Sequence, residues 1–162
     1  IKPFKQEFIE KSVLERLIEN DEIYVHKYIC QLSNYHNIHE QLKQQFYIYK
    51  YGESIDYFIL IVEGCLIVEV GKEKTEILAK QFDYFGEKAL LGDGKNKEQI
   101  IENKPEYRPY VPEYSLKIDY DQQYFTGDQN VKVLLYLKID RNTWLQAVKA
   151  TCFKRNQSQA II

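Results

Sequence analysis

Short runs of β-branched and aromatic residues recur about every ten positions between residues 45 and 91. The runs span 46–51, 56–63, 65–70, 75–79 and 81–85, and four of them are followed directly by Gly52, Gly64, Gly71 or Gly86. Short strands joined by tight turns pair with their neighbours in antiparallel fashion, and such series form barrels or jelly rolls. The stretch 45–91 is therefore predicted to be the core of an antiparallel β-barrel.

The residues before this core, 1–44, are predicted to be helical. Ser12 and Glu15 have the spacing of a capping box, in which a hydroxyl and a carboxylate each satisfy a free backbone N–H group. An apolar stripe at helical spacing follows, made of Val13, Leu14, Leu17 and Ile18. A second helix is expected from Asp21 to about Leu32, and a short third one over 38–44.

Residues 92–130 interrupt the strand pattern and contain three of the four prolines. We expect a long, partly ordered insertion here, with a possible strand over 114–120. The strand pattern resumes over 131–139, and Asp140 is expected to cap a final helix over 140–152, after which the polar tail should fray. The sequence thus predicts one α+β domain over residues 1–162.

Composition excludes several function classes. With 22 Lys+Arg against 24 Asp+Glu the formal charge is −2, so the electrostatic drive for binding nucleic acid is missing. The longest apolar run, 57–62, is far too short to span a bilayer, so no direct membrane insertion is expected. The chain contains no Met, and we therefore expect it to be a segment of a longer protein.

Two strings resemble the cyclic-nucleotide-binding fold. YGE at 51–53, followed by DYFILIVEG at 56–64, resembles the strand–turn–strand core of such domains. FGEKALL at 85–91 resembles the opening of their phosphate-binding cassette. The resemblance implies an antiparallel barrel of the jelly-roll type with helices at both ends.

Within that superfamily the chain is similar to the cyclic-nucleotide-binding homology (CNBH) domain of the cyclin M (CNNM) magnesium and divalent-metal transport mediators. The similarity runs from about residue 8 to 151 and includes SVLERL at 12–17, VEVGKE at 68–73, the long insertion, and LKIDR at 137–141. It implies a regulatory and homodimerising domain on the cytoplasmic face of a membrane protein. The partners implied are a second copy and the CBS module and membrane domain of the same protein. The family resemblance also implies that cyclic nucleotides are not bound.

The residues of the cassette-like segment can be compared with those that a cyclic-nucleotide site requires. A cyclic nucleotide needs a carboxylate for its ribose 2′-hydroxyl and an Arg whose planar fork meets the phosphate. Glu87 matches the carboxylate, but the Arg position falls on Asn96. Losing a bidentate charge-assisted contact typically costs about 2–4 kcal/mol of binding energy. The residues therefore favour a cassette that no longer binds.

The alternative is a genuine cAMP or cGMP receptor domain. Its ligand-binding residues would be Gly86, Glu87, Ala89, Lys95 and Lys97, with a lysine as a flexible substitute for the missing Arg. An Arg entering from the insertion, for instance Arg108, would favour this alternative. A barrel filled by its own side chains would favour the regulatory domain.

Catalytic, metal and cofactor sites are not expected. No nucleophile–base motif or phosphate-binding glycine loop is present. His36 and His39 beside Glu40 provide two imidazoles without a third ligand. His26 is expected on the surface of a helix. All three histidines precede the barrel, which argues against a cupin metal site. The odd set of cysteines is expected to be reduced and buried; it comprises Cys30, Cys65 and Cys152.

The first expected strand, 46–51, carries large side chains on both faces, with Phe46 and Ile48 alternating with tyrosines. One face must pack in the barrel, so the other needs a cover. The N-terminal helices or a second subunit could supply it, and the sequence leaves both alternatives open.

Overall fold

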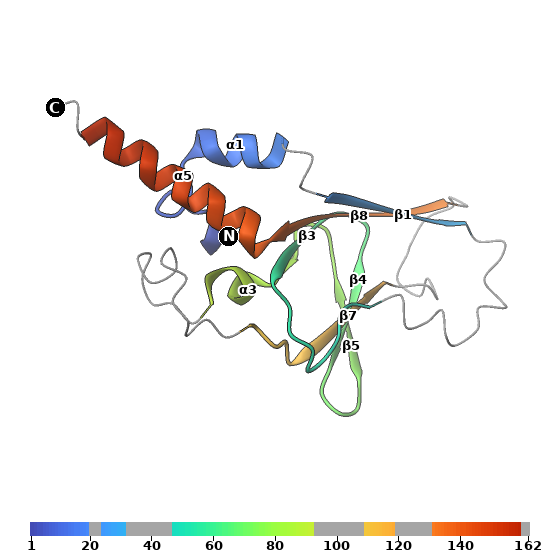
Figure 1. Ribbon diagram of the computed structural model, residues 1–162. Helices are drawn as coiled ribbons and strands as arrows, with labels where there is room; N and C mark the ends of the chain where they lie inside the picture. Colours follow the sequence, from blue (N-terminus) through green and yellow to red (C-terminus); the bar gives the residue numbers. More distant parts are fainter. Residues whose placement is uncertain (20–23, 32–46, 93–108, 119–130, 160–162) are drawn as a thin grey trace.

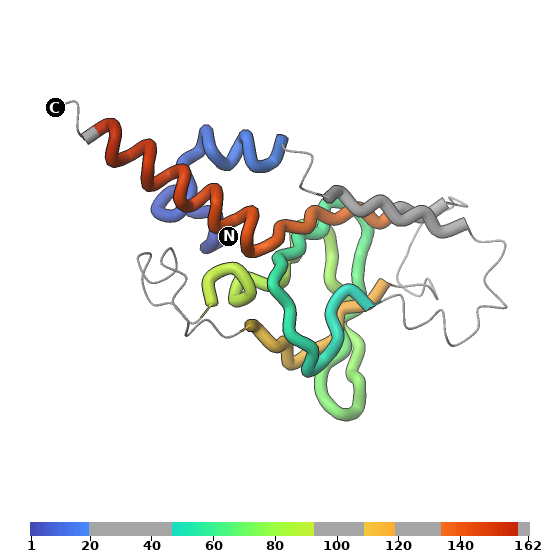
Figure 2. Tube along the Cα trace, in the orientation of Figure 1, coloured from blue at the N-terminus to red at the C-terminus, as the bar shows by residue number. Residues whose placement is uncertain are grey.

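The computed structural model (Figure 1) describes residues 1–19, 24–31, 47–92, 109–118 and 131–159 of the chain. They form two antiparallel sheets with helices at one side, and the colours of Figure 2 show the N-terminal and C-terminal segments lying together there. The predicted α+β class, with an antiparallel β core, is confirmed.

Each sheet has four strands in the described part of the chain. The first has the order β1-β8-β3-β6 and contains β1 (Tyr24–Gln31), β8 (Val131–Asp140), β3 (Tyr57–Glu63) and β6 (Tyr84–Phe85). The second has the order β2-β7-β4-β5 and contains β2 (Tyr47–Tyr49), β7 (Tyr114–Ile118), β4 (Leu66–Val70) and β5 (Thr75–Ala79). The non-consecutive order arises because β7, which lies within the predicted insertion, and β8, which follows it, each pair between strands that come earlier in the chain.

In the described residues, four helical elements accompany the sheets: η1 (Lys2–Phe4), α1 (Lys11–Glu19), α3 (Glu87–Leu91) and α5 (Arg141–Gln159). α1 packs against α5, while η1 lies against α3. Trp144 of α5 is fully buried, and its Nε1 donates a hydrogen bond to the Pro3 carbonyl at 3.0 Å. The N-terminal segment is thereby fixed to both α3 and α5.

The predicted second helix is wrong, because residues 24–31 form β1. All eight residues pair with β8, from Tyr24 opposite Lys138 to Gln31 opposite Val131. A segment rich in Tyr, Val and Ile fits a pleated sheet, and a partner strand about 110 residues away cannot be seen in local periodicity. The helix expected over 38–44 lies outside the described residues.

The expected helix ends also need correction. Ser12 is not an N-cap, because α1 already begins at Lys11 and the Glu10 carbonyl accepts the N–H groups of Val13 and Leu14. The final helix does not fray at 154 but continues to Gln159. The N-terminal segment supports this extension, since Lys154 Nζ donates to Glu10 Oε1 at 2.8 Å.

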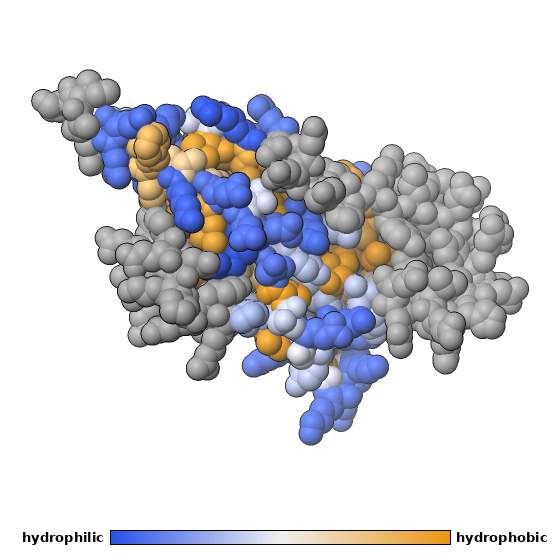
Figure 3. All heavy atoms as spheres, in the orientation of Figure 1, coloured by the Kyte–Doolittle hydropathy of each residue, from blue (hydrophilic) through white to orange (hydrophobic). Residues whose placement is uncertain are grey.

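The buried side chains for which the structure gives positions form two clusters. One lies between the helices and the outer face of the first sheet, and includes Phe8, Phe58 and Trp144. The other lies between the two sheets, and includes Tyr49, Ile61 and Leu116. In the view of Figure 3, hydrophobic side chains also reach the surface among the polar ones, along α5 and over the sheets.

Candidate functional site

The cassette helix α3 begins at a glycine that no other residue could replace without strain. Gly86 has φ +84°, and a Cβ there would lie 2.4 Å from the Tyr57 carbonyl oxygen and 2.6 Å from Tyr49 Oη. Ala89 and Leu90, within α3, are completely buried. The chain therefore enters α3 through a left-handed residue pressed against β3, in agreement with the glycine expected at this corner.

Glu87, the residue matched to the ribose-binding carboxylate, already has a partner within the chain. Its Oε1 accepts a hydrogen bond from the backbone N–H of Lys2 at 3.0 Å. Lys2 belongs to η1, whose Pro3 is held by Trp144. The carboxylate therefore joins the cassette helix to the N-terminal segment.

The space between the sheets next to Gly86 is filled by aromatic side chains. Tyr49 is only 1% exposed, and its Oη donates to the Tyr57 carbonyl at 3.0 Å. Its ring centroid lies 5.2 Å from that of Tyr57 and 6.2 Å from that of Tyr114, which in turn lies 5.8 Å from that of Phe85. These rings are in mutual contact at the distances typical of packed aromatic pairs.

Burial keeps these phenols neutral. It raises the pKa of Tyr49 well above the usual value, and it raises that of Tyr57 to about 12, with a smaller contribution from neighbouring tyrosines and acids. The pKa of Tyr114 is raised as well, first by burial and then by Tyr110. These three tyrosines therefore stay neutral above the pH at which an ordinary phenol ionises, and they give the interior ring contacts and neutral hydroxyl groups.

The second sheet carries a network of charged side chains. Lys117 Nζ lies 2.6 Å from Glu69 Oε1 and 2.6 Å from Glu76 Oε1, and Tyr47 Oη donates to Glu69 Oε2 at 3.1 Å. Burial opposes ionisation of Glu69, but the hydrogen bond and charge of Lys117 outweigh it and lower the pKa of Glu69. Both acids are bonded to the same lysine within the sheet, so we assign this network to the stability of the sheet.

The predicted site residues fall into two groups. Gly86, Glu87 and Ala89 come together at α3, whereas Lys95, Asn96, Lys97 and Arg108 lie outside the described residues. His36, His39 and Glu40 also lie outside them.

The remaining expectations concern His26 and the cysteines. His26 lies in β1 and not on a helix, Cys65 is buried as expected, and Cys152 is partly buried.

Within the described ranges, no group of three His, Cys, Asp or Glu side chains is placed to hold a metal ion. No helix among those ranges is both long and apolar enough to cross a membrane.

Sequence reasoning missed the role of Tyr49. The alternation over 46–51 predicts that Tyr47, Tyr49 and Tyr51 share one face. The pairing of β2 with β7 shifts register between Tyr47 and Tyr49, however, so Tyr49 enters the core between the sheets while Tyr47 contacts Glu69. Tyr51 remains 67% exposed. A bulge of this kind leaves no signal in the alternation itself.

Comparison with known proteins adds a family and a structural neighbour. Residues 1–154 match the family model described as "Metal transporter CNNM2-like, C-terminal CNBH domain". A cyclic nucleotide-binding-like protein from Brucella abortus bv. 1 str. 9-941 is 13% identical, with a TM-score of 0.49. The alignment covers 85% of this chain and 84% of that one.

Proposed function

Because the chain belongs to the family of C-terminal CNBH domains of CNNM2-like metal transporters, we propose that it is a regulatory domain that self-associates and does not bind cyclic nucleotides. As a member of this family it is a regulatory domain of a divalent-metal transporter. Its place would be the cytoplasmic face of the membrane, next to the CBS module and the membrane domain of the same protein. This role requires no catalysis.

The observation that carries the proposal is the burial of Tyr49. A bound nucleotide needs a cavity in which its sugar and phosphate approach the start of α3. Tyr49 Oη is hydrogen-bonded to the Tyr57 carbonyl where that cavity would open, and Gly86 leaves no free space beside it. Binding would require a fully buried side chain to leave the core, which is costly.

The position of Glu87 supports the same conclusion. The Lys2 N–H holds Oε1 of the carboxylate, so the Glu87 side chain is oriented by a contact within the chain and needs no ribose hydroxyl to fix it. The cassette is thus retained for its contacts within the domain.

Isothermal titration calorimetry with cAMP and cGMP tests the proposal. We expect no saturable heat up to millimolar ligand, either for the unchanged chain or for Glu87→Ala. A micromolar binding isotherm that is lost in Glu87→Ala would establish the receptor domain instead. Thermal unfolding of both proteins controls for damage to the fold.

Sedimentation velocity tests the second half of the proposal. Exposed hydrophobic side chains such as Ile18 and Phe82 provide apolar area that a second copy can cover. We expect the sedimentation coefficient to rise with concentration from that of a monomer to that of a dimer. A concentration-independent monomer would contradict self-association but would leave the conclusion on nucleotides unaffected.

A further inference from the structure

The C-terminal end of α5 is helical although it is barely buried. Thr151 is 0% exposed, but none of the described residues of α5 beyond it is buried. In a protein, the stability of a helix comes mostly from packing of its apolar face, and a segment as short as 152–159 does not form a helix alone in water. Residues 152–159 therefore depend on contacts made by exposed and half-buried side chains.

Lys154 and Arg155 connect this end of α5 to the N-terminal segment, by which we mean residues 1–10. Lys154 Nζ donates a hydrogen bond to Glu10 Oε1 at 2.8 Å. The Arg155 guanidinium donates to the two backbone carbonyl groups of residues 6–7. Two adjacent cations are thus bound by one short stretch of backbone and side chain. The end of α5 and the N-terminal segment therefore hold each other in place.

The other end of the N-terminal segment is bound to the cassette helix. The Lys2 N–H donates to Glu87 Oε1 at 3.0 Å. Between the two ends the backbone forms a closed turn, in which the Lys5 carbonyl accepts the N–H groups of residues 8–9. A displacement that begins at Lys2 is therefore passed on to residues 6–10, which hold the end of α5.

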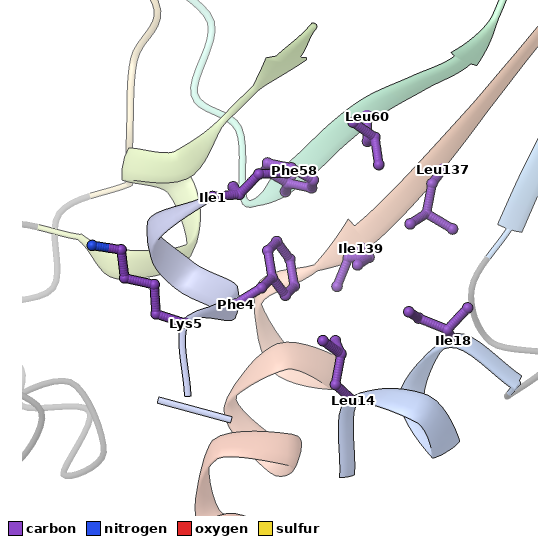
Figure 4. Close-up of a pocket in the computed structure, with 9 residues that line it drawn as sticks. All are labelled: Ile1, Phe4, Lys5, Leu14, Ile18, Phe58, Leu60, Leu137 and Ile139. Atoms are coloured by element: carbon purple, nitrogen blue, oxygen red, sulfur yellow. The ribbon is translucent and has the colours of Figure 1, made fainter. Parts of the chain in front are cut away.

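Packing beneath the N-terminal segment is incomplete. A pocket of about 290 Å³ lies between η1, α1 and the first sheet (Figure 4). Phe4 and Leu14 point into it from the helical side, while Phe58 and Ile139 line it from the sheet. A void of this kind forfeits part of the dispersion energy of the side chains around it. The hydrogen bonds at the two ends of the segment therefore contribute more to its attachment than they would over a filled core.

We propose that the N-terminal segment acts as a strap whose docked position keeps residues 152–159 helical, so that its displacement unwinds the end of α5 and loosens α3. The inference rests on the proposed regulatory function, since the family is one of C-terminal domains and the remainder of such a transporter precedes this segment. A movement that arrives from that side reaches the segment first. Because coupling between two parts is reciprocal, loosening the end of α5 also loosens the segment.

Hydrogen exchange of the whole chain, followed by mass spectrometry, tests the coupling with Glu10→Ala. The variant removes the carboxylate that accepts from Lys154 and leaves the backbone of the segment unchanged. We expect exchange over 152–159 to become about threefold faster, in the range of a half-exposed ion pair. Glu7→Ala is the matched control, because its side chain is exposed and its contact with Arg155 is made by the backbone carbonyl. Equal exchange over 152–159 in the two variants would overturn the strap.

Glu87→Ala tests the distant end of the segment. It removes the acceptor of the Lys2 N–H at the start of α3. We expect exchange over 152–159 to become about twofold faster, less than after the direct loss at Glu10, while β3 and β4 stay unchanged. Lys88→Ala, at the neighbouring exposed position of α3, should leave residues 152–159 unchanged. A rise confined to α3, or one spread equally over β3 and β4, would contradict transmission through the segment.

Asn156→Pro tests the reverse direction. Asn156 is exposed, and proline inside a helix removes a backbone hydrogen bond and clashes with the preceding turn. Unwinding of the end of α5 should then speed exchange over residues 4–10 by at least about twofold, because the coupling is reciprocal. Unchanged exchange over 4–10 would show that the segment docks without the end of α5 and would refute the coupling.

The exchange results and the earlier proposals fail separately. A nucleotide-binding isotherm or a strictly monomeric chain would contradict the proposed function without altering the exchange pattern. A missing response over 152–159 would overturn the strap and leave the proposals on nucleotides and self-association intact.

Discussion

The backbone N–H of Lys2 donates a hydrogen bond to the carboxylate of Glu87, 85 positions further along the chain, at 3.0 Å. In a nucleotide-binding cassette the corresponding carboxylate would face a ribose. Here it holds the N-terminal segment, whose Pro3 carbonyl accepts the indole N–H of Trp144. The start of the chain, the cassette helix and the final helix are therefore linked without any ligand.

Substitution of Gly86 by Ala should be far more costly than the same change at Gly71. Both glycines have positive φ, +84° and +75°, but a Cβ at Gly71 meets nothing within 4 Å. We expect Gly71→Ala to lower the free energy of unfolding by about 1 kcal/mol through backbone strain alone. Gly86→Ala adds a clash with backbone and should cost about 3 kcal/mol or more. Equal losses in urea unfolding would contradict the tight approach of α3 to β3.

The strand core was predictable because its signals are local. Turn glycines and short β-branched runs placed β3, β4 and β5 within a residue or two of their observed bounds. β1 was not predicted because it is a strand only through its pairing with β8, and β8 is separated from it by most of the sequence. The strand predicted over 81–85 is shorter in the structure, where only Tyr84 and Phe85 form β6. The preceding residues form a turn, because the Asp83 N–H donates to the Lys80 carbonyl and the Lys80 N–H donates to the Asp83 carboxylate.

Tyr49→Phe tests the hydrogen bond that fixes the core between the sheets. The variant keeps the ring but removes the hydroxyl that donates to the Tyr57 carbonyl. We expect a loss of about 1–2 kcal/mol in the free energy of unfolding, since a buried carbonyl loses its donor. Tyr51→Phe, at a 67% exposed position, should change stability by less than about 0.5 kcal/mol. Comparable effects of the two changes would argue against a filled interior.

Lys117→Met should destabilise the second sheet in a pH-dependent way. Lys117 neutralises Glu69, which is only 9% exposed, and it lowers the pKa of that carboxyl against the opposing effect of burial. Stability from the pair is therefore present above the usual carboxyl pKa and is lost as pH falls through the lowered one. We expect a loss of about 2 kcal/mol at pH 7, which shrinks below about pH 4. A pH-independent difference would refute this role of the pair.

Alkaline solution should unfold the domain through its buried phenols. The pKa of Tyr57 is raised from 10.0 to about 12, so the folded state retains a proton that the unfolded chain releases earlier. Stability from this group is complete below about pH 10 and is lost as pH rises towards 12. Urea unfolding across pH 8–12 should show this decline, and Tyr57→Phe should reduce its slope. An unchanged slope in that variant would show that Tyr57 does not cause the loss of stability at alkaline pH.

The candidate site was only partly predictable from sequence. Gly86, Glu87 and Ala89 lie at α3, and the family match over residues 1–154 confirms the resemblance from which they were selected. The burial of Tyr49 between the sheets depends on a register shift in β2, and the partner of Glu87 comes from a distant segment at residue 2. Both are products of tertiary structure, which residue spacing does not encode.

The central claim is that the cassette serves the fold and not a nucleotide. The most direct measurement is a ¹H–¹⁵N NMR titration of the chain with cAMP and cGMP, following the amides of Lys2 and residues 86–91. The account predicts unchanged positions for these signals up to millimolar ligand, because Tyr49 and Lys2 retain their contacts. Saturable shifts at micromolar ligand, centred on Gly86 and Glu87, would contradict it.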